Sequence, residues 1–283
     1  MDGDLKTLLK GKLSLEELAS VYKSYDIIGD IAIIRIPEKL LPHSETIAEA
    51  LMHQHKHVKA VWRQSSPVSG VFRLRKLEWI AGGKETETVY KEHTCLFKVD
   101  IKECYFSPRL AFERMRIASL VKDKEVVVNM FAGVGSYSII IAKHSKAAKV
   151  YSIDINSIAV KYLRENALLN KMVNRVIPIE GDAETIIRRN LKNVADRVLM
   201  PLPEKAYEYI DSALLAIKSQ GGWIHYYDFE HARKLENPIE KVEMKVAEKL
   251  QQKKADFDLP YSRLVRQTGP NWYQVAVDIQ VKQ

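Results

Sequence analysis

Cysteine is scarce in this sequence of 283 residues, and long apolar runs are absent. Cys95 and Cys104 are too few for a disulfide framework and are not spaced as metal ligands, so we expect a reducing compartment and no metal. No stretch approaches the roughly 18 apolar residues of a membrane-spanning helix. The first 20 residues carry acids among their leucines and lack the apolar segment of a signal peptide. We therefore expect a soluble, cytoplasmic protein without a membrane partner.

The composition is otherwise that of a folded protein with an excess of positive charge. Hydrophobic residues make up 46% and charged residues 28%, which excludes disorder as the default and allows one large or two modest domains. Lys and Arg number 44 against 36 Asp and Glu, a formal net charge of +8. Such an excess favours a polyanionic partner such as a nucleic acid, but a basic solvated surface gives the same numbers.

The first hundred residues have the pattern of an α+β unit. Helical spacing of leucines predicts a helix over 5–20, and a second helix is expected at 44–55, opened by Ser44. Apolar and polar residues alternate in segments that predict a mostly antiparallel sheet; these segments are 25–36 around Gly29, 58–64, 71–82, 86–93 and 95–101.

From about residue 106, strand-like and helix-like segments alternate. A helix is predicted over 107–121, with Ser107 as its N-cap and Pro108 in the first turn. The predicted strands are 125–130, 149–154, 175–181, 195–200 and 222–229, and the predicted helices are 135–145, 157–170, 183–191, 204–219 and 231–254. This alternation predicts an α/β fold with a parallel sheet, closed by an antiparallel hairpin over 261–281. We place the domain boundary between 1–103 and 104–283.

The segment 129-NMFAGVGSYS-138 joins the first predicted parallel strand to a helix. Ligands of open α/β sheets bind at such turns, and Gly133 and Gly135 would let a ligand approach the backbone. Glycine in a strand-to-helix turn also serves packing alone, so the motif by itself leaves both interpretations open.

Two carboxylates at the next strand ends make a cofactor site the better interpretation. Asp154 can accept hydrogen bonds from both hydroxyls of a ribose, although it could also cap the following helix. Asp182 can accept a hydrogen bond from an adenine amino group. The dinucleotide fingerprint requires a third glycine where this chain has Ser138. S-adenosyl-L-methionine fits the turn and the acidic strand end better.

With 104-CYFSPRLAFERMR-116, 151-YSIDIN-156 and 196-DRVLMPLP-203 added to the glycine turn, the chain resembles the archaeal and eukaryotic methyltransferases that form N1-methylguanosine at position 37 of tRNA. The resemblance covers nearly the whole chain from about residue 20. It implies a class I, Rossmann-like catalytic domain, S-adenosyl-L-methionine as donor, and the anticodon loop of tRNA as partner. It also implies that 1–103 binds RNA and closes over the site; we expect a monomer.

The resemblance also implies roles for individual residues. Glu113 corresponds to the family's proposed general base, and Arg73 to the arginine that stabilises charge on the guanine O6. A glutamate that accepts the N1 proton makes guanine nucleophilic. Arg75, Arg109, Pro201 and Pro203 would contact the substrate. The cofactor pocket would be lined by Tyr105, Phe131, Ala132, Gly133, Gly135, Asp154, Ile155, Asp182 and Ala183. A charge pair between Glu113 and Arg109 on one helix face is the plain structural alternative.

Three departures from the family pattern are visible. Asn129 stands where an acidic residue usually starts the glycine turn, and Pro201 stands where an asparagine follows the fourth strand. Proline offers neither an N–H nor a side-chain donor, so it cannot hold a base as asparagine does. Only some 20 residues precede the first strand, where archaeal members carry a small domain that reads the tRNA elbow, so the anticodon loop would have to supply more of the affinity.

Alternative functions stay open at this point. The related wybutosine-pathway transferase moves an aminocarboxypropyl group from the same cofactor, and a bifunctional enzyme would also methylate the tricyclic base. A non-catalytic RNA-binding module is the alternative from another class. Basic residues beside aromatic ones suit RNA loops in any of these; they include Arg73, Arg75, Lys76, Arg263, Arg266 and Trp272.

Overall fold

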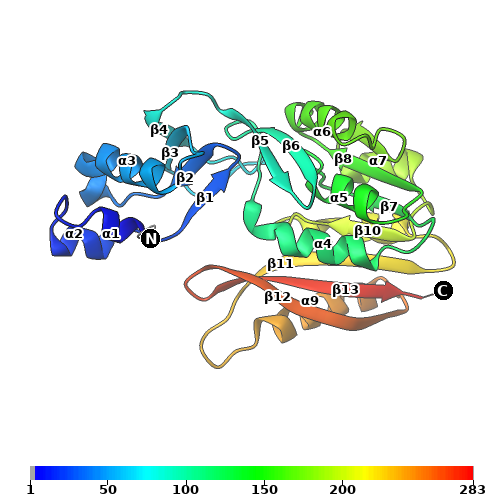
Figure 1. The fold of residues 1–283 in the computed structure, drawn as a ribbon. Helices are drawn as coiled ribbons and strands as arrows, with labels where there is room; N and C mark the ends of the chain where they lie inside the picture. Colours follow the sequence, from blue (N-terminus) through cyan, green and yellow to red (C-terminus); the bar gives the residue numbers. More distant parts are fainter. Residues whose placement is uncertain (1–3, 283) are drawn as a thin grey trace. The chain divides into compact units, whose positions relative to one another are not determined.

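The computed structural model describes residues 4–282, and the chain forms two compact units. The first unit ends at Arg109 and the second begins at Leu110 (Figure 1). Within the described residues, no helix is both long and apolar enough to cross a membrane. The predicted boundary after residue 103 stays a prediction of where the functional domains divide.

The helices of the first unit are α1 (Leu5–Leu8), α2 (Leu15–Ser20) and α3 (Ser44–Gln54), with a 3-10 segment η1 (Glu38–His43) before α3. The predicted continuous helix over 5–20 is wrong. Gly11 has a φ of +78°, which ends the helical path, and Ser14 starts α2 with a capping box that it forms with Glu17. The helix predicted from Ser44 is confirmed.

The first unit contains two sheets rather than the single sheet predicted. One has the order β1-β2-β3-β4 and is made of β1 (Tyr25–Ile28), β2 (Ile31–Ile34), β3 (Ala60–Gln64) and β4 (Leu77–Gly82). The strands β2 and β3 are parallel because α3 lies between them in the chain, and residues of α3 share their apolar core. A separate hairpin is formed by β5 (Glu87–Glu92) and β6 (Cys95–Asp100).

The second unit is built on a seven-stranded sheet of order β12-β13-β11-β10-β7-β8-β9. The parallel strands are β7 (Val126–Asn129), β8 (Lys149–Asp154), β9 (Val176–Glu180), β10 (Arg197–Met200) and β11 (Gly222–His231). The hairpin of β12 (Phe257–Gly269) and β13 (Trp272–Val281) adds to β11 in the antiparallel direction. The predicted Rossmann-like sheet with an antiparallel closing hairpin is confirmed.

The helices of the second unit are α4 (Ala111–Leu120), α5 (Ser136–His144), α6 (Ser157–Leu169), α7 (Ala183–Asn190), α8 (Ile210–Ala216) and α9 (Pro238–Gln252). Apolar residues of α7, α8 and α9 share one core with the sheet, while α4 packs against α5 (Figure 1).

Three of the predicted helices begin later than expected. Residues Pro108–Leu110 form a 3-10 turn, η2, and Leu110, at φ −98° and ψ 8°, is the N-cap of α4, so Ser107 does not occupy that position. The helix predicted over 231–254 begins only at Pro238, which Asn237 caps. Residues 204–219 likewise divide into η3 (Ala206–Tyr209) and α8.

Candidate functional site

The glycine turn of the second unit is shaped by two left-handed residues. Gly133 has a φ of +56°, and Gly135, the N-cap of α5, has a φ of +90°. A Cβ built on Gly135 would lie 2.2 Å from Leu163 Cδ1 of α6. Packing against α6 therefore requires Gly135, whereas the turn at Gly133 is held by a carboxylate of the next strand.

Asp154 joins that turn to the end of β8. Its Oδ2 accepts a hydrogen bond from Gly133 N at 2.6 Å, and its Oδ1 accepts one from Asn156 N at 2.9 Å. Burial raises the pKa of Asp154 above its ordinary value, against the opposing effect of the backbone hydrogen bonds. The helix-cap alternative is wrong, because Asn156 caps α6 by accepting from the amides of Ile158 and Ala159. A carboxylate has about four acceptor positions, so Asp154 keeps capacity for a further donor.

Asp182, at the end of β9, has two structural partners. It caps α7 by accepting from Thr185 N at 2.9 Å, and it accepts from the hydroxyl of Tyr209 at 2.6 Å. Burial acts to raise the pKa of Asp182, but the hydrogen bonds from Tyr209 and Thr185 bring it below its ordinary value. The ring of Tyr209 also meets Phe131 edge-on, with centroids 5.1 Å apart. Tyr209 was missed by sequence reasoning, since nothing local distinguishes it within 204–219.

The strand order brings these residues to one edge. Phe131, Ile155 and Asp182 follow β7, β8 and β9, which are adjacent and parallel, so their carboxyl ends meet. Ala132 and Ala183 are buried beside them, and Ile155 is half exposed. Pro201 and Pro203 follow β10 at the same edge, where Pro203 is buried and Pro201 is partly exposed.

Asn129 lies in a neutral, fully buried hydrogen-bond network. Its Nδ2 donates to Ser138 Oγ at 3.1 Å, and Ser152 donates to the same hydroxyl at 2.7 Å. Its Oδ1 accepts from Phe131 N at 3.3 Å. An amide supplies both a donor and an acceptor here, which accounts for an uncharged residue at the start of the glycine turn.

Glu113, on α4, is 1% exposed and has cationic partners. Arg116 donates to its two oxygens at 2.7–3.1 Å, Arg263 donates to Oε2 at 2.8 Å, and the Tyr227 hydroxyl donates to Oε1 at 2.8 Å. Burial raises the pKa of Tyr227 well above its ordinary value, and the Glu113 charge acts in the same direction. Only Arg116, three residues along the helix, could have been found from spacing.

The structural alternative, a pair of Glu113 with Arg109, is wrong. Arg109 instead donates to Asp26 Oδ1 at 2.7 Å within the first unit, where Arg75 donates to Asp26 Oδ2 at 3.4 Å and to Phe106 O at 3.2 Å. The side chain of Asp26 is only 14% exposed, and a carboxylate with so little access to water is costly without cationic partners.

Arg73 and Arg75 do not lie in a strand, as the predicted segment over 71–82 would require, because β4 begins only at Leu77. Arg73 lies in a turn with a φ of +55°, closed by a hydrogen bond from its N–H to Gly70 O. Its guanidinium stacks 4.1 Å from the ring centroid of Tyr105. The side chain is therefore held by a cation–π contact rather than by a strand.

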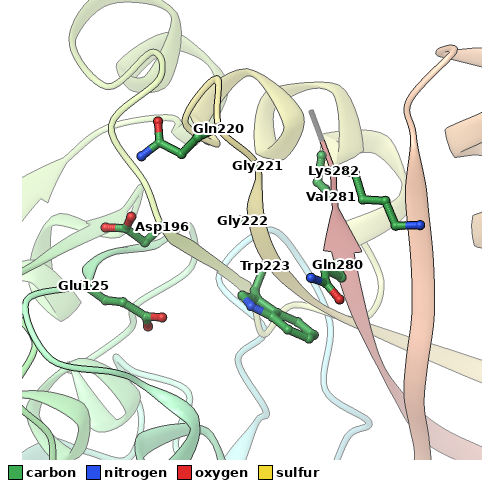
Figure 2. A pocket seen from close by; sticks show the side chains of 9 residues that line it. All are labelled: Glu125, Asp196, Gln220, Gly221, Gly222, Trp223, Gln280, Val281 and Lys282. Atoms are coloured by element: carbon green, nitrogen blue, oxygen red, sulfur yellow. The ribbon is translucent and has the colours of Figure 1, made fainter.

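A hollow lies at the opposite, amino-terminal edge of the large sheet. It has a volume of about 470 Å³ and is lined by residues that include Glu125, Asp196 and Trp223 (Figure 2). Its carboxylates already have partners: Asp196 accepts from Lys218 at 2.7 Å and Glu125 from Arg197 at 2.9 Å. It contains none of the predicted site residues. Within residues 4–282, no group of three or more potential ligands could hold a metal ion.

Two family profiles match the chain. The TRM5/TYW2 methyltransferase domain matches residues 88–254, and the TYW2 N-terminal domain matches residues 5–86.

Curated relatives include both methyltransferases and an aminocarboxypropyltransferase. The tRNA (guanine(37)-N(1))-methyltransferase Trm5b of Pyrococcus abyssi is 41% identical over 91% of this chain and 74% of its own length. The tRNA 4-demethylwyosine(37)-methyltransferase Taw21 of Saccharolobus solfataricus is 37% identical over 97% of this chain and 99% of its own length. The tRNA(Phe) (4-demethylwyosine(37)-C(7)) aminocarboxypropyltransferase of Methanocaldococcus jannaschii is 37% identical over 90% of this chain and 96% of its own length.

Solved structures give the same grouping. The complex of aTrm5 with tRNALeu aligns with a TM-score of 0.84 and 35% identity over 100% of this chain and 79% of that one. The TYW2 of P. horikoshii in complex with MeSAdo aligns with a TM-score of 0.80 and 28% identity over 100% of this chain and 99% of that one. On the profile match and the shared fold, this chain belongs to the TRM5/TYW2 methyltransferase family.

Proposed function

We propose that the protein is an S-adenosyl-L-methionine-dependent tRNA methyltransferase that methylates N1 of guanosine-37, next to the anticodon. The observation that carries the proposal is the carboxyl edge of the large sheet, where the glycine turn, Asp154 and Asp182 follow three adjacent strands. The 41% identity to a relative named for this reaction supports it. With tRNA as partner, we expect a monomer that acts in the cytoplasm.

The residues at this edge fit the cofactor. Asp154 accepts backbone hydrogen bonds from Gly133 and Asn156, and a carboxylate with about four acceptor positions keeps capacity for a ribose hydroxyl. Phe131 and the half-exposed Ile155 offer apolar surface for the adenine, and Asp182 an acceptor for its amino group. When bound there, the cofactor supplies the methyl group as an electrophile on its sulfonium.

Glu113 is the residue we assign to the N1 proton of guanine. Its oxygens already accept hydrogen bonds from Arg116, Arg263 and Tyr227, so one of these donors must give way before the carboxylate can accept a proton. Arg263 is the best candidate to move because its side chain is 23% exposed, whereas that of Arg116 is 11% exposed. Arg73 stays our proposal for the group that stabilises charge on the guanine O6.

A tricyclic, wyosine-type base at position 37 is a second candidate acceptor. Pro201 favours it, because proline cannot donate the hydrogen bond by which the family's asparagine would hold guanine. The alignment with Taw21 over 99% of that relative supports the same acceptor. Aminocarboxypropyl transfer from the same cofactor is the remaining alternative and is consistent with the relative from M. jannaschii.

One labelling experiment separates these reactions. The protein is incubated with tRNA that carries either unmodified G37 or 4-demethylwyosine, and with cofactor labelled in the methyl or the carboxyl carbon. Methyl label in the G37 tRNA supports the proposal, and methyl label only in the tricyclic tRNA moves the acceptor to the second candidate. Carboxyl label in RNA would show aminocarboxypropyl transfer and overturn the proposal.

Cofactor binding tests the enzyme assignment against the RNA-binding module. Asp154→Ala should weaken S-adenosyl-L-methionine binding by roughly tenfold or more, because a carboxylate that accepts hydrogen bonds is removed. Asp258→Ala is the matched control, since Asp258 lies on β12 and pairs with Lys282 at the surface. Isothermal titration measures both variants. A wild-type protein that binds no cofactor would leave only the RNA-binding module.

A further inference from the structure

Charged side chains form a continuous buried chain between α4 and the large sheet, and it starts at Glu113. Arg116 donates to Glu113 at 2.7 Å and, with its other side, to both oxygens of Asp278 at 2.6 and 3.1 Å. Only 5% of the Asp278 side chain is exposed. Arg116 is thus held between two carboxylates, and its orientation toward Glu113 depends on Asp278.

His225 lies directly across from Asp278 in the pairing of β11 with β13, and it is fully buried. Its Nδ1 lies 2.6 Å from Asp278 Oδ1, and its Nε2 lies 2.6 Å from Nη1 of Arg197. Arg197 in turn donates to Glu125 at 2.9 and 3.2 Å and to Leu120 O, in the last turn of α4, at 2.9 Å. His225 therefore connects two arginine–carboxylate pairs: Arg116, in the middle of α4, with Asp278, and Arg197, which contacts the last residue of α4, with Glu125.

The partners determine the protonation of His225. An arginine can only donate, so Nε2 must accept from Arg197, and the proton must be on Nδ1, where it is donated to Asp278. Burial lowers the pKa of His225. The charges of Arg197 and Arg116 act in the same direction, while Asp278 opposes them. The neutral ring also balances the charge, since Arg116, Arg197 and Arg263 offset Glu113, Asp278 and Glu125.

A network of this kind is weak evidence for stability, because well-packed apolar residues of similar volume often replace buried ion pairs without loss. What it does provide is a fixed direction for each donor. Arg116 cannot rotate away from Glu113 without breaking two hydrogen bonds to Asp278, and Asp278 cannot follow it without leaving His225.

We propose that His225 is a positioning residue that acts through Asp278 and Arg116 to hold the Glu113 carboxylate where it accepts the proton of the target base. The inference rests on the proposed function of Glu113. It assigns the neutral Nδ1–H tautomer a role in the rate of methyl transfer and not in binding of the cofactor or tRNA.

Two substitutions test the hydrogen bonds of the two ring nitrogens separately. In His225→Asn, the amide nitrogen can take the place of Nδ1 and keep the donor to Asp278. In His225→Gln, the amide oxygen can take the place of Nε2 and accept from Arg197, but the donor to Asp278 is lost. We expect His225→Gln to lower kcat on the order of tenfold with unchanged KM for tRNA, which is a partial loss of general-base catalysis. His225→Asn should keep most of the wild-type kcat.

A double-mutant cycle decides whether His225 acts through Glu113. In a Glu113→Gln background, His225→Gln should change kcat by less than about twofold, because the group that it positions is already gone. An equal fall in both backgrounds would show a general structural effect and would overturn the proposal. His144→Gln, at the exposed end of α5, is the control for a histidine outside the network.

The outcomes separate this inference from the proposed function. If the wild type transfers no methyl group to either tRNA, the proposed function fails. If the wild type is active and His225→Gln has an unchanged kcat, the inference alone fails. Circular dichroism melting checks each variant; if His225→Gln is unfolded, Asp278→Asn takes its place in the cycle. Failure of both variants to fold would make the network a folding element and would also overturn the inference.

Discussion

Gly135→Ala should destabilise the second unit by about 2–5 kcal/mol, the sum of two effects. The backbone at Gly135 has a φ of +90°, and a side chain in the left-handed region costs about 1–2 kcal/mol. The new methyl group would also lie 2.2 Å from Leu163 Cδ1, and such overpacking costs about 1–3 kcal/mol. The same change should weaken cofactor binding, because α5 would have to move away from α6.

Urea unfolding followed by circular dichroism measures this loss of stability. Two further variants separate its backbone cause from its packing cause. Gly11→Ala has a comparable φ of +78° with no atom within 4 Å of the new Cβ, so it should show the backbone effect alone. The double variant Gly135→Ala, Leu163→Ala should be less destabilised than the sum of the single variants, because the smaller side chain removes the clash. Strict additivity, or a loss at Gly135 no larger than at Gly11, would refute the packing argument.

Three further predictions concern the site and the buried network. Asp278→Asn should lower the free energy of unfolding at neutral pH by about 3–5 kcal/mol, because Arg116 loses a buried partner. Burial acts to raise the pKa of Asp278, but His225 and Arg116 hold it well below its ordinary value. The wild type should therefore lose stability as the pH falls below about 4, and urea titrations should show that Asp278→Asn lacks this part of the acid sensitivity. Asn156→Ala should cost about 1 kcal/mol through loss of the α6 cap, with cofactor affinity by calorimetry unchanged; a large loss of affinity would assign Asn156 to the site. Pro201→Asn should raise the rate of methyl transfer to G37 tRNA roughly tenfold if one missing hydrogen bond limits it, and an unchanged rate would exclude that explanation.

The elements of the second unit could be predicted because their signals are local. Buried β-branched runs alternate with helical periodicity, and Gly133, Asp154 and Asp182 lie where strands end in the chain. Errors occurred where a local pattern was interrupted. Gly11 and Ser14 divide a leucine-rich segment that was predicted as one helix, and the turn around Arg73 interrupts a segment that alternates like a strand.

The amino-acid sequence by itself therefore determined the Rossmann-like fold, the family and the edge of the sheet at which a cofactor would bind. Only the tertiary structure decided the partners of the charged groups. Glu113 meets Arg263 and Tyr227, and Arg109 meets Asp26, across more than 80 residues of chain in each case. Periodicity reports whether a side chain is buried, whereas the identity of its partner depends on strand order, here on β12, β13 and β11 lying side by side.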